Sequence, residues 1–86
     1  MPTMRCKLRL NAVIENKSDD GVKHSERLVF NAVSKKEGYA DDGLDENNTF
    51  AKFSPSADFT ITVQNPALFD KMVEGEEYYV DFTKAE

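Results

Sequence analysis

Residues 4–14 follow an apolar–polar period of two over eleven consecutive positions. The apolar set is Met4, Cys6, Leu8, Leu10, Ala12 and Ile14, and the polar set is Arg5, Lys7, Arg9 and Asn11. Successive side chains of a strand point to opposite faces of its sheet. The period therefore predicts a long strand with one buried face and one basic face.

Four further segments have the composition of strands. Residues 25–34 follow an Asp-Gly step that suits a hairpin turn, so we expect them to pair antiparallel with 4–14. Both faces of this strand are expected to be partly covered, one with Leu28, Phe30 and Ala32 and the other with Arg27, Val29, Asn31 and Val33. Residues 49–53 form a short predicted strand that ends before Pro55, because proline cannot donate to a ladder. Residues 58–63 and 77–82 also alternate and complete the set.

A short helix is predicted at residues 65–72, before the last strand. Asn65 is a good N-cap, Pro66 suits the first helical position, and Leu68, Phe69 and Met72 supply an apolar face. The expected order is thus β-β-β-β-α-β in a single domain over residues 1–86. A small antiparallel barrel or sandwich of five strands would hide the sheet edges.

The basic face of the first strand raises the question of nucleic-acid binding. Small barrels bind single strands with a basic groove and stacking aromatic rings. The candidates are Arg5, Lys7, Arg9 and Arg27 for the phosphates, and Tyr39, Phe53 and Tyr79 for stacking. The alternative is that these cations pair with acids of the neighbouring strand, and the net charge of −5 favours this alternative.

An acidic loop at residues 35–48 is the second candidate contact surface. Its carboxylates are Asp41, Asp42, Asp45 and Glu46. They could dock on a basic protein partner or imitate phosphates, or they could simply keep the loop solvated. Their spacing does not match a calcium-binding loop, so no metal site is predicted.

Catalytic constellations are weak in this sequence. The single histidine, His24, is expected at the solvated end of a hairpin, and the single cysteine, Cys6, on a buried strand face as an inert thiol. We therefore expect no enzyme and no cofactor. No apolar run approaches the ~20 residues that a bilayer requires, and the amino-terminal segment lacks a secretory pattern, so we expect a cytoplasmic protein without membrane contact.

The carboxyl-terminal half resembles a group of small proteins from tailed bacteriophages and prophages. The matching segments are Asn47–Asn48, Phe50, Lys52–Ser56, Asn65–Pro66, Gly75 and Tyr78–Thr83. The resemblance implies phage origin and brings no established activity and no catalytic residues. A pair between Lys52 and Asp81 on adjacent strands would explain the polar positions of the pattern.

The expected function is a non-catalytic interaction module acting in the bacterial host cytoplasm or in the virion. It would serve as a virion or assembly component, or as an inhibitor of a host defence complex. The alternative is a binder of single-stranded DNA in phage DNA metabolism. A protein partner is expected, and self-association is left open.

Overall fold

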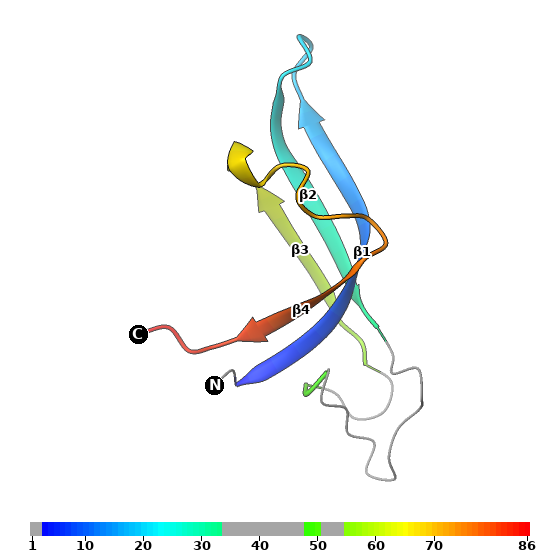
Figure 1. The fold of residues 1–86 in the computed structure, drawn as a ribbon, viewed down its shortest axis with the longest axis vertical. Helices are drawn as coiled ribbons and strands as arrows, with labels where there is room; N and C mark the ends of the chain where they lie inside the picture. Colours follow the sequence, from blue (N-terminus) through cyan, green and yellow to red (C-terminus); the bar gives the residue numbers. More distant parts are fainter. Residues whose placement is uncertain (1–2, 34–47, 51–54) are drawn as a thin grey trace.

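The described part of the chain forms an antiparallel sheet in which the last strand returns beside the first. The structure, a computed structural model, describes residues 3–33, 48–50 and 55–86. Within these ranges lie β1 (Met4–Lys17), β2 (Lys23–Ala32), β3 (Asp58–Val63), the 3-10 turn η1 (Pro66–Leu68) and β4 (Glu77–Phe82). The spatial order is β3-β2-β1-β4, which is a Greek-key order (Figure 1). None of the described helices is long and apolar enough to cross a membrane.

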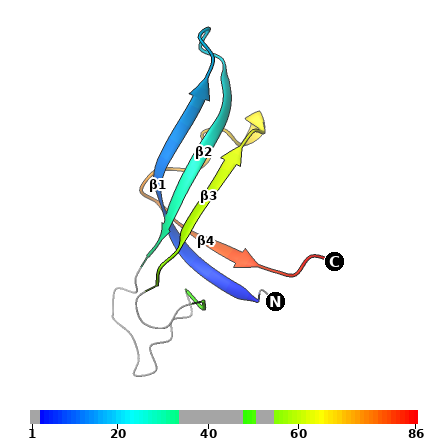
Figure 2. The same ribbon diagram turned by 180° about the vertical axis from the view of Figure 1, so that it is seen from behind.

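The sheet stays open, so the predicted closed barrel or sandwich of five strands is wrong for the described part of the chain. β2 pairs with β1 from Leu8 to Lys17, whereas β4 pairs with β1 from Met4 to Arg9. The two partners of β1 overlap only at Leu8 and Arg9, and β3 and β4 run in clearly different directions in both views (Figures 1 and 2). Because of this stagger, the two outer strands do not meet.

The predicted strand at residues 49–53 has no counterpart where it can be examined. Thr49 and Phe50 lie in a turn, and residues 51–53 lie outside the described residues. The predictions for the other four strands are confirmed, although β1 runs three residues further than the expected end at residue 14 and β2 spans Lys23–Ala32 instead of residues 25–34.

A bulge in β1 overturns part of the predicted face assignment. The register passes from Leu10 opposite Phe30 to Ala12 opposite Val29, which leaves Asn11 as the extra residue. An extra residue reverses the alternation of all later side chains relative to the partner strand. Val13 therefore lies opposite the buried Leu28 and packs on the core, whereas Ile14 lies opposite Arg27 and is 52% exposed. The expected core positions of Ala12 and Ile14 were wrong.

The predicted helix at residues 65–72 is also wrong, although its first residues behave as expected. The Asn65 side chain accepts a hydrogen bond from the Ala67 amide at 3.1 Å, and Pro66 begins η1. The turn ends at the extended Phe69, and Asp70 then takes a positive φ of 62°. Its N–H donates to Glu26 Oε2 of β2 at 3.1 Å instead of to a helical carbonyl. A bond to the sheet thus replaces helix propagation.

The core lies on one face of the sheet. Its buried apolar members in the described ranges are Cys6, Leu8, Leu10, Leu28 and Phe30. Phe59 of β3 and Tyr78 of β4 meet Phe30 edge-on, with ring centroids 5.8 Å and 6.2 Å away. The β3–β4 connection crosses this face and packs Met72 on the core (Figure 1). The predicted burial of Cys6 is confirmed, and burial raises the pKa of its thiol.

Candidate binding surfaces

The basic strip, which we define as Arg5, Lys7 and Arg9, is neutralised by acids of β4. Arg5 makes a two-pronged contact with Asp81, with Nε–Oδ1 and Nη2–Oδ2 distances of 2.7 Å and 3.1 Å. Glu77 accepts from Arg9 Nη2 at 2.8 Å and lies 3.4 Å from Lys7 Nζ. The register places Arg5 opposite Asp81 and Arg9 opposite Glu77. The alternative interpretation of this strip, cross-strand pairing, is therefore confirmed.

These ion pairs shift the pKa values of Asp81, Glu77 and Arg5. The hydrogen bond from Arg5 and its positive charge lower the pKa of Asp81, and the hydrogen bond from Arg9 is the main cause of the lowered pKa of Glu77. The same contact raises the pKa of Arg5. Both carboxylates therefore stay ionised at neutral pH, and three cations facing two anions leave little positive potential for a phosphate backbone.

The other predicted nucleic-acid residues do not complete a groove. Arg27 shares the strip's face, but it lies four residues from Asn31, the partner of Arg9, which is about 13 Å along the strand. Tyr79 is 53% exposed and carries the Arg5 guanidinium 4.7 Å from its ring centroid. Tyr39 and Phe53 lie outside the described residues, as do Asp41, Asp42, Asp45 and Glu46 of the predicted partner loop. Lys52, which was predicted to pair with Asp81, also lies outside the described residues, and the Asp81 carboxylate binds Arg5.

An apolar groove on the opposite face was not foreseen from the sequence. Its volume is about 310 Å³. Its floor is Leu28 and Phe30, and its walls come from β3, from the crossing connection and from β4. The wall residues are Phe59, Ile61, Val63, Leu68, Lys71, Met72, Tyr78, Tyr79 and Val80. The groove exists because β3 and β4 splay apart over a face that both strands line with apolar side chains.

The rim of the groove carries one cation. Lys71 is the single charged residue among the described lining residues, and its ammonium group makes no ion pair within the described part of the chain. Ile61 and Leu68 of the walls are 44% and 52% exposed. A ligand in this groove would therefore meet apolar surface and the ammonium group of Lys71.

A buried carboxylate joins the crossing connection to the sheet. Glu26 is 2% exposed, accepts from Lys23 Nζ at 2.5 Å and holds the Asp70 amide described above. Lys23 also lies 3.0 Å from Asp70 and 3.5 Å from Glu15, and these carboxylates, Glu26 first, raise its pKa. The burial of Glu26 could have been inferred from the sequence, because alternation places Glu26 on the same face of β2 as Leu28 and Phe30.

A second buried polar residue, Asn48, bridges β1 and the residue after β2 at the point where these two strands stop pairing. Its side chain accepts from the Lys7 amide at 2.7 Å and donates to the Val33 carbonyl at 2.9 Å, and the residue is fully buried. Thr49 continues the pattern through bonds with the backbone of Arg5. The expectation that Asn48 belongs to a contact loop was wrong, since it is part of the interior.

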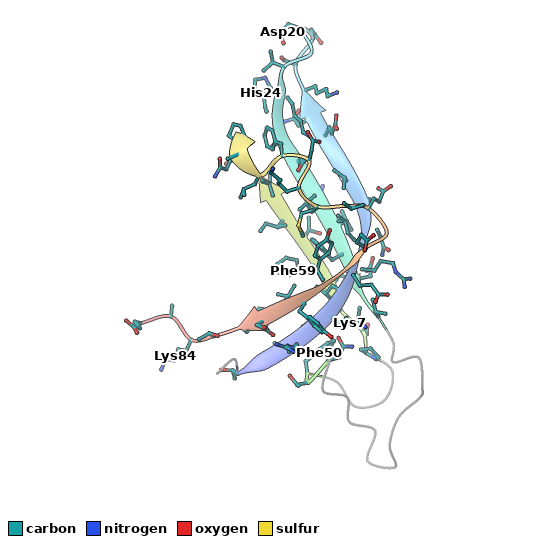
Figure 3. All side chains as sticks on the ribbon, in the orientation of Figure 1. Lys7, Asp20, His24, Phe50, Phe59 and Lys84 are labelled. Atoms are coloured by element: carbon teal, nitrogen blue, oxygen red, sulfur yellow. The ribbon has the colours of Figure 1, made fainter. Side chains whose placement is uncertain are left out.

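The groups that nucleophilic catalysis would need lie apart. His24 is exposed near the tip of the β1–β2 hairpin, while Lys7, next to Cys6, lies toward the other end of the sheet (Figure 3). A buried thiol and a distant imidazole cannot share a proton. In the described ranges, no group of three or more His, Cys, Asp or Glu residues is arranged to hold a metal ion.

Comparison with known proteins gave no match. No family model, curated protein or solved structure matches this chain.

Proposed function

We propose that this chain is a non-catalytic binding module that holds an apolar, acid-bearing segment of a partner protein in its groove. The observation that carries this proposal is the groove itself, which leaves Ile61 and Leu68 exposed above the floor formed by Leu28 and Phe30. Concave apolar surfaces with a few polar groups are the usual form of binding sites. Burial of each large apolar side chain supplies roughly 1.5–3 kcal/mol.

Lys71 indicates the charge of the occupant. An ammonium group that has no ion pair within the described residues, at the rim of an apolar site, favours a ligand with a carboxylate at that point, and such a pair fixes orientation more than it adds affinity. The proposed occupant therefore carries one or two large apolar side chains beside an Asp or Glu.

The biological setting of the proposal rests on the resemblance to phage proteins. In that setting the module is a phage-encoded accessory, acting in the host cytoplasm or in the virion, whose partner is an assembly component or a host defence protein. The carboxylates of Asp41, Asp42, Asp45 and Glu46 would be a second contact for that partner.

A random-peptide display selection against the purified full chain tests the groove. We expect enriched peptides that combine large apolar residues with Asp or Glu. Leu68→Glu should reduce their affinity at least tenfold, since it places a carboxylate in the apolar wall. Val22→Glu is the matched control. Val22 is 51% exposed, which is close to the 52% of Leu68, but it lies at the hairpin turn and not in the groove wall. Equal affinity for the two variants, or enrichment of basic peptides, would refute the proposal.

Binding of single-stranded DNA is the second candidate function. It is favoured by the exposed Tyr79 ring beside Arg5 and opposite Lys7, an arrangement on which a base could stack. Fluorescence polarisation with a labelled single-stranded oligonucleotide at about 50 and 200 mM salt distinguishes this function, since binding through phosphates weakens steeply with salt. Salt-sensitive binding that Tyr79→Ala abolishes and that Leu68→Ala leaves unchanged would favour it over the groove.

A further inference from the structure

We infer that two copies of this chain associate through antiparallel pairing of their β3 strands. β3 forms one end of the described sheet, and its outer side has no partner strand among the described residues. The inference goes beyond the proposed function, because it depends on the β3 edge and does not require any ligand in the groove.

The hydrogen-bond phase of β3 shows which of its backbone groups face the outer edge. The Ala32 amide donates to the Ala57 carbonyl at 3.1 Å, so this is a bonded pair of the β2–β3 ladder. Bonded and non-bonded pairs alternate in an antiparallel ladder. From the register, Phe59 and Ile61 bond to β2, and the N–H and C=O groups of Asp58, Thr60 and Thr62 point away from it.

This phase is compatible with a symmetric pair of β3 strands. With Ile61 on the two-fold axis, Thr60 lies opposite Thr62 of the second copy and supplies the bonded pairs. Phe59 then lies opposite Val63, and Ile61 opposite Ile61, on the groove face. Aromatic–β-branched and Thr–Thr pairs stabilise antiparallel sheets, and Asp58 would lie opposite the uncharged Gln64.

The β3 edge also lacks the features by which proteins block edge pairing. Its sequence, DFTITV, has no lysine and no proline, and its register with β2 has no bulge. The β4 edge differs, because symmetric pairing centred on Tyr79 would place Glu77 opposite Asp81 of the other copy. Like charges directly opposite are destabilising, whereas β3 pairing centred on Ile61 brings no like charges opposite one another.

Symmetric β3 pairing would bring the two grooves together. Ile61 is part of the groove wall, so the wall residues of both copies would adjoin across the two-fold axis. A six-residue strand pair buries less than the roughly 1,200–2,000 Å² of a stable interface, and we therefore expect a reversible dimer.

Sedimentation velocity and disulfide trapping test the inference. The full chain should shift from monomer to dimer between roughly 10 μM and 1 mM, the range of a weak association. Thr62→Pro should remain monomeric over this range, because it removes an amide that faces the outer edge and not β2. Thr62→Ala, the matched control, should still dimerise. A wild-type chain that stays monomeric throughout, or a Thr62→Pro variant that dimerises as the wild type does, would overturn the inference.

Trapping reports on the register independently. Non-bonded pairs have Cα atoms about 4.5 Å apart, within the range that a disulfide spans. Ile61→Cys should therefore form a covalent dimer under mild oxidation at low protein concentration. Ile14→Cys is the control for random collision, since Ile14 is 52% exposed on another strand and Ile61 is 44% exposed. Equal cross-linking of the two variants, or none in Ile61→Cys, would contradict the proposed register.

Discussion

At the scale of single residues, two buried polar side chains determine how irregular segments attach to the sheet. Glu26 holds the Asp70 amide of the crossing connection, and Asn48 bridges Lys7 and Val33 where two strands separate. Each supplies a hydrogen-bond partner to part-buried backbone groups of another segment. Such groups cost about 1–3 kcal/mol each when left unsatisfied.

Removal of the Glu26 carboxylate should destabilise the fold. Glu26→Ala leaves the Asp70 amide and the Lys23 ammonium without their buried acceptor. We expect the free energy of unfolding to fall by about 1.5–3 kcal/mol, the value of a hydrogen bond to a charged group. Urea denaturation measures the change. Glu15→Gln, an exposed partner of the same lysine, is the control and should have little effect. Equal losses in the two variants would show that burial of Glu26 is unimportant.

At the scale of elements, the bulge at Asn11 decides which side chains of β1 reach the core. Thr at position 13 should cost about 1–2 kcal/mol, because the hydroxyl is placed against Leu28, whereas Thr at position 14 should change stability by about 0.5 kcal/mol or less. Thermal or urea unfolding of Val13→Thr and Ile14→Thr compares the two. A regular strand without the bulge predicts the reverse order.

The ion pairs between β1 and β4 should make stability depend on acidity. The pKa values of Asp81 and Glu77 are lowered in the fold from ordinary values of 3.8 and 4.5. The stability that these two ionised carboxylates add to the fold is thus fully present above the ordinary pKa values. It is lost as the pH falls through the lowered pKa values of the folded state. Urea midpoints of the wild type and of an Arg5→Gln, Arg9→Gln variant should differ at pH 6 and converge at strongly acidic pH.

The control for the acid series is Lys84→Gln, which removes one positive charge in the exposed segment after β4. Its difference from the wild type should stay small across the whole series. A difference between the wild type and the double arginine variant that does not change with pH would mean that these carboxylates do not titrate with folding.

At the scale of the whole molecule, the crossing connection returns the chain to the far side of β1. Gly75, with a φ of 93°, donates from its amide to the Leu10 carbonyl at 2.7 Å, and the Leu10 amide donates to Glu76 at 3.0 Å. This positive φ aligns the start of β4 with β1. Apart from its chain neighbours, no heavy atom lies within 4 Å of the place that a Cβ on Gly75 would take. The requirement at this position is therefore conformational, not steric.

Gly75→Ala should destabilise the protein by about 1–2 kcal/mol, the cost of a left-handed conformation for a residue with a Cβ. Glu76→Ala, at the next and exposed position, is the control and should change stability by about 0.5 kcal/mol or less. Chemical denaturation followed by circular dichroism measures both. No loss in Gly75→Ala would mean that this turn relaxes without cost.

The sequence alone determined the class of the fold, four of the strands and most of the core, because the period of two is a local property that each strand carries in its own residues. It also indicated the pairing of the basic strip as one of two alternatives. The tertiary structure decided the register, the bulge at Asn11 and the loss of the predicted helix, because these depend on partners distant in the sequence, such as Glu26 for the Asp70 amide. The apolar groove belongs to the same group. It arises where β3 and β4 diverge, and no single segment encodes the angle between two strands that never pair.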